Sequence, residues 1–204
     1  YLSTGDYKRA IIIGADQLSS YVDWTDRGSC ILFGDGAGAI AIEATKEVNN
    51  LYGFTMKTDG NRGCFLNLAK TNDLGRINND IEFEKGGFSQ ISMNGQEVYK
   101  FAVREVPLII ENLLKKTNFA AKEIDWVVLH QANQRILDAV GERLKIPHSK
   151  VLSNLSHYGN TSAATIPIML DESIRNKKIK ENDLIISSGF GAGLSWGAAL
   201  IRWG

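Results

Sequence analysis

A histidine and two amide side chains follow directly after the clearest apolar run in the sequence. Residues 126–129 read Trp-Val-Val-Leu, and His130, Gln131 and Asn133 come next. Such a run is typical of a buried strand in a parallel sheet. Ligands of open α/β sheets bind beyond the carboxyl ends of strands, so His130 would lie where chemistry is usually done. A core histidine bonded to a backbone carbonyl is an equally good interpretation of these residues alone.

A second polar turn, at residues 156–162, contains Asn160 and follows a short predicted strand at Val151-Leu152. Loops at the carboxyl ends of adjacent parallel strands lie side by side, so Asn160 and His130 could face one space. An imidazole N–H and a carboxamide N–H are both donors, and together they would stabilise an enolate oxygen. Gly-Asn before Thr-Ser is also an ordinary turn and helix-start signal, which leaves a purely structural role for Asn160 open.

A glycine-rich segment, Gly-Phe-Gly-Ala-Gly at residues 189–193, follows another predicted strand. It matches neither the P-loop nor the dinucleotide fingerprint, because no Gly-Lys-Ser/Thr follows and a predicted strand comes next instead of a helix. Backbone N–H groups without a phosphate motif suggest an oxyanion hole, and a tight strand connection is the alternative. The two cysteines, Cys30 and Cys64, are more typical of packing than of reactive thiols.

The other predicted elements would position these residues. Strands are predicted at 8–14, 39–44, 51–58, 124–129, 183–188 and 196–203, and helices at 96–117, 136–144 and 163–174. Residues 59–95 show little periodicity and are predicted to be an irregular functional loop region. Alternating strands and helices after residue 50 indicate a mostly parallel sheet covered by helices. One pattern occurs twice, at residues 31–44 and 184–201: strand-like residues, then a glycine-rich segment, then an apolar strand. This repeat suggests a duplicated α/β fold.

Composition narrows the function classes. The chain has 204 residues, of which 44% are hydrophobic, and its 23 Lys and Arg balance its 23 Asp and Glu. This balance gives no argument for nucleic acid or membrane binding, and no apolar run approaches the roughly 20 residues of a membrane helix. Two cysteines without metal spacing fit a reducing, intracellular compartment. The opening residues 1–5 resemble the end of a helix, so the chain is expected to be a fragment.

Five segments, taken in order, resemble the β-ketoacyl-acyl-carrier-protein synthase III family, the initiating condensing enzymes of fatty-acid synthesis. They are residues 22–27, 33–39, 130–136, 157–164 and 189–197. The resemblance implies an α/β, thiolase-like fold of two βαβαβαββ halves with mixed, mainly parallel sheets. Residues 1–48 would be the end of a truncated first half, and residues 49–204 would be the second half with the active-site His and Asn.

The resemblance also implies residue roles. His130 and Asn160 match two members of a Cys–His–Asn triad whose cysteine would precede Tyr1, so this chain alone is expected to be inactive. Gly191 and Ala192 match the oxyanion loop. The positions that match binding to CoA or its pantetheine arm are Arg27, Gly95 and Asn133. The segment that matches the carrier-protein docking surface is Gln131, Ala132, Asn133, Gln134 and Arg135.

The implied reaction is a decarboxylative Claisen condensation of acetyl-CoA with malonyl-ACP, which gives acetoacetyl-ACP, CoA and CO2. No metal or other cofactor is implied; the partners are acyl carrier protein, acyl-CoA and a second subunit of a homodimer, with no nucleic acid or membrane. The cytoplasm or the plastid stroma is the expected location. A polyketide-type condensing enzyme and a non-catalytic acyl-binding partner subunit are the alternatives.

Overall fold

The computed structural model describes residues 1–45, 50–77 and 81–204, without the side chains of residues 69–88, so the predicted boundary at residues 48–49 lies outside the described residues. The strands are β1 (Arg9–Gln17), β2 (Asp35–Glu43), β3 (Leu51–Thr58), β4 (Leu66–Ile77), β5 (Ile81–Met93), β6 (Trp126–Leu129), β7 (Leu184–Gly191) and β8 (Ser195–Arg202). The α-helices are α1 (Gly95–Thr117), α2 (Gln134–Leu144), α3 (Leu155–Tyr158) and α4 (Thr165–Arg175).

The main sheet has four strands in the order β3-β8-β7-β6 and is mixed, as expected. The expectation of mainly parallel pairing is wrong for the described strands, because β6–β7 is parallel whereas β7–β8 and β3–β8 are antiparallel. β8 returns directly from β7 through a short turn, and such a turn can join only antiparallel strands. The strand predicted at Val151-Leu152 is reduced to one parallel bridge between Val127 and Val151.

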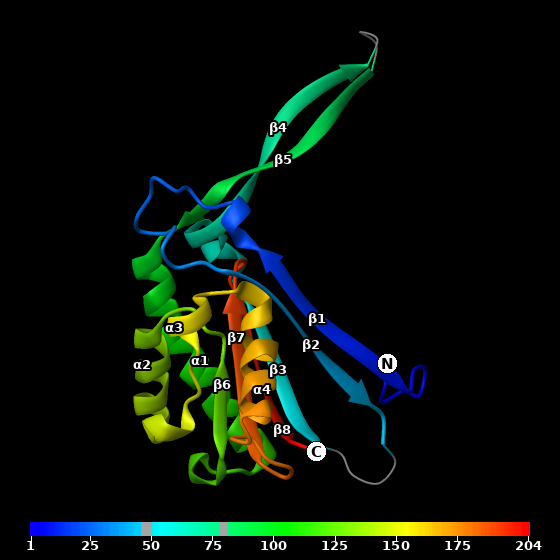
Figure 1. Cartoon of the computed structure of the whole chain (residues 1–204), viewed down its shortest axis with the longest axis vertical. Coiled ribbons are helices and arrows are strands. Elements are labelled where there is room, and N and C mark those ends of the chain that lie inside the picture. The colour runs from blue at the N-terminus through cyan, green and yellow to red at the C-terminus, as the bar shows by residue number, and fades with distance from the viewer. Residues whose placement is uncertain (46–49, 78–80) are drawn as a thin grey trace.

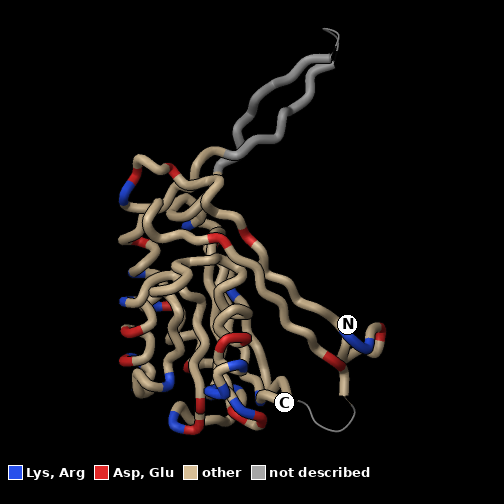
Figure 2. Tube along the Cα trace, in the orientation of Figure 1, with Lys and Arg blue, Asp and Glu red and all other residues tan. Residues whose placement is uncertain are grey.

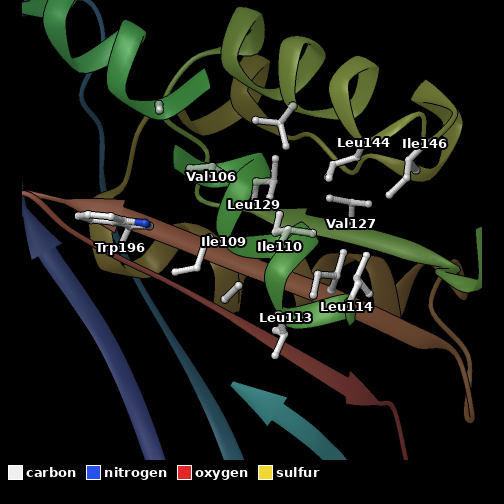
Figure 3. Close-up of a cluster of buried hydrophobic side chains, with 14 of the residues drawn as sticks. Val106, Ile109, Ile110, Leu113, Leu114, Val127, Leu129, Leu144, Ile146 and Trp196 are labelled. Atoms are coloured by element: carbon white, nitrogen blue, oxygen red, sulfur yellow. The ribbon is translucent and has the colours of Figure 1, made fainter. Parts of the chain in front are cut away.

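One face of this sheet is covered by α1 and α2 (Figure 1). The helix predicted at 96–117 is confirmed and begins one residue earlier, where the Asn94 side chain accepts a hydrogen bond from the N–H of Glu97 and so caps it. Its apolar side chains recur at helical spacing and pack on the sheet (Figure 3). Each fully buried aliphatic side chain of this kind contributes about 1.5–3 kcal/mol.

The other face of the sheet is covered by α4, which is in turn covered by the β1–β2 pair (Figure 1). Two glycines allow this close approach. A Cβ at Gly14 would lie 2.2 Å from the carbonyl oxygen of Ala163, and a Cβ at Gly38 would lie 2.9 Å from the ring of Pro167. The amino-terminal strands therefore lie directly against the segment that follows Asn160.

Residues 59–95, predicted to be irregular, instead contain a long antiparallel hairpin. β4 and β5 pair from Leu66 opposite Met93 to Ile77 opposite Ile81, with one register shift between Leu68 and Lys70. The prediction was wrong because glycine and asparagine residues obscure the alternation of side chains that marks a strand. The backbone hydrogen bonds that form a hairpin do not depend on that alternation.

The predicted duplication takes the form of two antiparallel strand pairs, β1–β2 and β7–β8. The first pair differs from the repeat at residues 31–44, because the strand-like start of that repeat lies in a turn at residues 30–32 and β1 is the strand that pairs with β2. β1 also continues to Gln17, beyond the predicted end at Gly14. The sequence repeat thus predicted the second strand of the first pair correctly and placed its partner strand wrongly.

Charged residues of both signs are interspersed over the outer helices and loops (Figure 2). No helix in the described parts of the chain combines the length and the apolar character required to cross a bilayer. Among the same residues, no group of three or more His, Cys, Asp or Glu side chains is placed to hold a metal ion.

Candidate active site

His130 is the first residue after β6, and its position is fixed by the neighbouring strand. Its backbone N–H donates to the carbonyl oxygen of Ser188 on β7 at 2.8 Å, which extends the parallel pairing by one residue. Its ring packs edge-on against Phe190, with centroids 5.2 Å apart and an angle of 82° between the planes. The ring atom Nδ1 lies 2.7 Å from Oγ1 of Thr165. Backbone and ring are therefore both held in place.

The imidazole of His130 is neutral at physiological pH. Removal from water disfavours the charged ring and lowers its pKa to about 4, although a hydrogen bond with the backbone of Ser162 partly opposes this shift. A neutral imidazole has one N–H donor and one acceptor nitrogen. The ring can therefore donate a hydrogen bond to a substrate oxygen without a formal positive charge of its own.

Asn160 is held by the chain segment that precedes β2. Its backbone N–H donates to the carbonyl of Leu32 at 2.9 Å, and its own carbonyl accepts from the N–H of Gly34 at 2.9 Å. Its side-chain Oδ1 accepts from the backbone N–H of Ser162 at 2.9 Å. This bond assigns Oδ1 and Nδ2 of the carboxamide and leaves the Nδ2 protons as donors. The oxygen of the amide thus has the turn role that the sequence left open, whereas the site role of Asn160 stays a prediction.

A cavity of about 590 Å³ brings the predicted residues together. Its wall includes seven of the site residues expected from the sequence: Gly95, His130, Ala132, Asn133, Asn160, Gly191 and Ala192. The rest of the wall is largely apolar, with contributions from Leu32, Phe33 and Ile91. His130 and Asn160 therefore face one space, as the strand order predicted.

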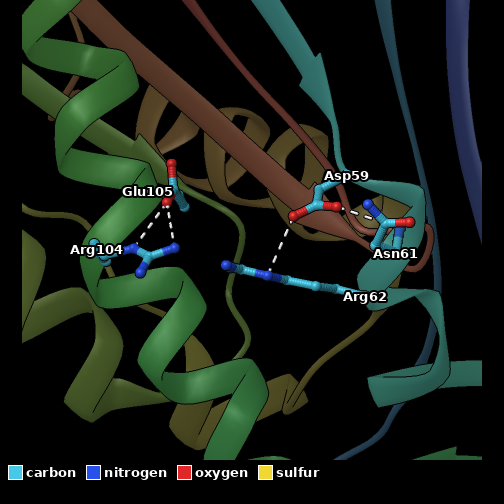
Figure 4. Close-up of polar contacts among 5 residues, drawn as sticks. All are labelled: Asp59, Asn61, Arg62, Arg104 and Glu105. Carbon is cyan, nitrogen blue, oxygen red and sulfur yellow. Dashed lines mark hydrogen bonds and ion pairs between the residues drawn. The ribbon is translucent and has the colours of Figure 1, made fainter.

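The glycine segment is a shorter turn than the sequence suggested. β7 continues through Gly191, so the turn itself is Ala192–Leu194. Asp59 anchors it, because the backbone of Asp59 donates to Leu194 O at 2.8 Å and accepts from Leu194 N at 3.1 Å. The Asp59 carboxylate in turn accepts from Asn61 N and forms a 3.1 Å ion pair with Arg62 (Figure 4). These contacts fix the backbone near Ala192 at the cavity wall.

One predicted carrier-protein contact is wrong. Gln131 is fully buried, and its Nε2 donates to Leu129 O at 2.8 Å and to Leu152 O at 3.2 Å. Its Oε1 accepts from the backbone N–H of Asn154 at 3.2 Å. Because a buried amide with three internal bonds cannot meet a docked protein, Gln131 is a structural link between two loops of the site.

The other predicted binding residues have mixed positions. Gln134 and Arg135 are exposed, and the Arg135 guanidinium lies 5.2 Å from the ring centroid of Tyr99, which lines the cavity. Asn133 lines the cavity and also caps α2, because its Oδ1 accepts from Arg135 N at 2.9 Å. Arg27 is exposed and is not among the residues that line the cavity, so its CoA contact stays a prediction.

Three residues of the site were missed by sequence reasoning. Thr165 contacts the His130 ring, Phe190 packs against it, and Asp59 anchors the glycine turn. Phe190 lies inside the glycine motif, so its position in the sequence was a usable signal. No sequence signal marked Thr165 or Asp59, because each meets its partner only after segments that are distant in the sequence have folded together.

Two family models match the chain. Residues 1–60 match 3-oxoacyl-[acyl-carrier-protein] synthase III, and residues 114–203 match the carboxyl-terminal model of the same enzyme. A β-ketoacyl-[acyl-carrier-protein] synthase III of Prochlorococcus marinus subsp. pastoris strain MED4 is 74% identical over 204 residues. The chain belongs to the β-ketoacyl-ACP synthase III family. It covers 61% of that relative's length, and all of the chain is matched.

Solved structures of the same family share the fold. The synthase III from Aquifex aeolicus is 38% identical with a TM-score of 0.86, and it matches 99% of this chain and 60% of its own. The Thermus thermophilus synthase III is 36% identical with a TM-score of 0.88, and it matches 100% of this chain and 61% of its own. The thiolase-like architecture expected from the sequence is confirmed. The division at residue 48 into two halves stays a prediction.

Proposed function

We propose that the protein containing this chain condenses acetyl-CoA with malonyl-ACP and so begins fatty-acid synthesis. The observation that carries this proposal is the convergence of His130, Asn160 and Ala192 on one cavity. The chain covers about 61% of the relative's length. The experiments below therefore use a protein that contains this chain and is as long as the relative, called the full-length protein.

The first half-reaction transfers the acyl group. A cysteine thiolate attacks the thioester carbon of acetyl-CoA, a C–S bond forms, and CoA leaves as its thiolate. Neither Cys30 nor Cys64 is among the residues that line the cavity. The nucleophile is therefore proposed to come from outside this chain, as the family resemblance implies.

The second half-reaction breaks the bond between the malonyl carboxylate and its α-carbon. CO2 leaves, and the electron pair passes to the thioester as an enolate whose oxygen accepts hydrogen bonds from His130 and Asn160 Nδ2. The enolate carbon attacks the acetyl thioester and the cysteine thiolate leaves, which gives acetoacetyl-ACP. The backbone N–H of Ala192 is proposed to stabilise the tetrahedral oxyanion. Preorganised donors of this kind supply much of the rate enhancement in acyl transfer.

The chemistry of the pair fits this step. A neutral imidazole and a carboxamide both donate without releasing a proton at neutral pH, so the enolate is stabilised and not quenched. The low pKa of His130, about 4, keeps the ring neutral throughout. A protonated imidazolium would instead offer its proton to the carbanion and give a decarboxylated acyl product.

Partial reactions of the full-length protein test the proposal. His130→Ala and Asn160→Ala should each lower malonyl-ACP decarboxylation by about 10²–10³-fold, the usual cost of one oxyanion donor. Acetyl transfer from CoA to the cysteine should be retained. His157→Ala is the matched control, because His157 is exposed and lies in the same segment, residues 156–162, as Asn160. Equal loss of both partial reactions would contradict the assigned roles.

A second function shares the same geometry. The priming β-ketosynthase of a polyketide pathway is 25% identical with a TM-score of 0.84, and it matches 99% of this chain. The largely apolar wall of the cavity would also accept an acyl group longer than acetyl. Competition between acetyl-CoA and longer acyl-CoA starters separates the two functions. A non-catalytic acyl-binding subunit would show no covalent acyl-enzyme with either starter.

Acyl carrier protein is the proposed partner, and we place its docking surface around Arg135. This side chain is exposed and packs on Tyr99 at the cavity wall, so it would meet an acidic protein that delivers its thioester into the cavity. A homodimer in the cytoplasm or the plastid stroma completes the proposal. Carrier-protein titration of the full-length protein tests the partner, and its sedimentation tests the homodimer.

A further inference from the structure

The hydrogen-bond partner of His130 Nδ1 is a hydroxyl that has a second partner. Oγ1 of Thr165 lies 2.7 Å from Nδ1 and 2.9 Å from the carbonyl oxygen of Ser162. Thr165 is only 2% exposed, so few other groups compete for its hydroxyl. A threonine hydroxyl carries one proton and two lone pairs, and it rotates to suit its neighbours. The single proton therefore points either to Ser162 or to His130.

The two orientations have opposite consequences for the ring. If the hydroxyl donates to Ser162 O, then Nδ1 must carry the ring proton and donate to Oγ1, which leaves Nε2 as an acceptor. If the hydroxyl donates to Nδ1, the ring proton must be on Nε2, which becomes a donor. A carboxylate or a carbonyl in the place of Thr165 could only accept, and it would hold the proton on Nδ1.

We propose that Thr165 is a positioning residue that allows His130 to carry its proton on Nε2. This inference rests on the proposed function, because stabilisation of the enolate oxygen requires a donor on the nitrogen that faces the substrate. When a thioester oxygen occupies the cavity, the ring loses its Nδ1 proton to water and takes a proton from water on Nε2, and the Thr165 hydroxyl turns from Ser162 to donate to Nδ1. The ring then donates to the substrate without rotating and without gaining a charge.

Removal of the hydroxyl should fix the opposite tautomer. The backbone of Ser162 also interacts with the His130 ring and raises its pKa, which is the effect of an accepting carbonyl. With a methyl group in place of the hydroxyl, this carbonyl is the remaining polar partner of Nδ1. It can only accept, so the proton stays on Nδ1 and Nε2 faces the substrate as a lone pair. Repulsion between that lone pair and the enolate oxygen opposes decarboxylation.

The test compares Thr165→Val with Thr165→Ser in the full-length protein. Val keeps the shape of Thr without the hydroxyl, whereas Ser keeps the hydroxyl. We expect Thr165→Val to lower malonyl-ACP decarboxylation by about 10²-fold, as for the loss of one oxyanion donor, with acetyl transfer retained. Thr165→Ser should restore decarboxylation. Thr165→Ala replaces Val if the latter variant does not fold, and its expected result is the same.

Ring nitrogen chemical shifts give a readout that does not depend on activity. In protein labelled with 15N-histidine, the His130 signals are those lost in His130→Asn. With a non-reactive malonyl thioester bound, Thr165→Ser should show the proton on Nε2 and Thr165→Val should show it on Nδ1. The same tautomer in both variants, or equal loss of both partial reactions, would overturn the inference. If the tautomer differs between the two variants as expected but the unsubstituted protein has no condensing activity, the proposed function alone is overturned.

Discussion

The backbone N–H of Gly34 donates a hydrogen bond to the carbonyl oxygen of Asn160, with 2.9 Å between the two atoms. Together with the bond from Asn160 N to Leu32 O, it joins two segments that lie far apart in the sequence. Gly34, which directly precedes β2, is therefore part of the framework of the candidate site. Its role is to hold the backbone of Asn160 while the side chain faces the cavity.

Gly34→Ala should displace Asn160. A Cβ at position 34 would lie 2.2 Å from the carbonyl oxygen of Tyr158, so the backbone on one side must move. We expect a loss of about 1–3 kcal/mol in stability, the usual cost of overpacking, and a fall in malonyl-ACP decarboxylation. Urea unfolding and the partial-reaction assay measure the two effects. Gly60→Ala is the control, because a Cβ there has no neighbour within 4 Å; a similar loss in both variants would contradict the contact.

Gln131→Leu should destabilise the protein without any specific effect on the carrier protein. The substitution leaves the carbonyls of Leu129 and Leu152 and the N–H of Asn154 without their present partner. Each buried group that loses its partner costs about 1–3 kcal/mol. Urea unfolding of the full-length protein measures the change.

The exposed neighbour Gln134→Leu serves as the control for this substitution and should change stability by less than about 0.5 kcal/mol. A Gln131→Leu protein of normal stability with a raised KM for malonyl-ACP would restore the docking role that its burial excludes.

Arg135→Glu should weaken the use of malonyl-ACP more than the use of acetyl-CoA. The guanidinium is exposed and is supported by Tyr99, so charge reversal would oppose the approach of an acidic carrier protein. The expected result is a KM for malonyl-ACP that rises about 10-fold or more and falls again as salt screens the charges. Steady-state kinetics at two salt concentrations measure it. Lys115→Glu, at the far end of α1, is the control; equal effects of both variants on both substrates would argue against docking at Arg135.

The depressed pKa of His130 should make the protein less stable as the pH falls. The unfolded histidine binds a proton near its ordinary value of 6.5, whereas the folded one does so only near 4. Between these values the unfolded state binds more protons, so stability falls as the pH falls from 6.5 to about 4, and below that this ring causes no further change because both states are protonated. Urea unfolding of the full-length protein from pH 4 to 8 should show this slope.

His130→Asn removes the titrating ring, and the part of the slope that belongs to His130 should disappear with it. Acidic side chains also contribute below about pH 5, and the difference between wild type and variant removes their share. An identical slope in His130→Asn and wild type would mean that the folded ring titrates normally.

Local sequence pattern was enough for several features. The helical spacing of apolar residues gave α1, the apolar run before His130 gave β6, and the order of strands placed His130 and Asn160 at one cavity. These features depend on periodicity within a single element or on the direction of neighbouring parallel strands. Both properties can be recognised in short stretches of sequence. The five family motifs added the expected roles of the site residues.

The contacts that decide how the site works depend on tertiary structure. Burial of Gln131, the anchoring of the glycine turn by Asp59 and the hydroxyl of Thr165 beside His130 each join residues that are distant in the chain. The residue type of a polar side chain does not specify whether it is exposed or buried, and tertiary packing determines its hydrogen-bond partner. The sequence therefore determined which donors are present, and the folded chain decided which of these residues line the cavity.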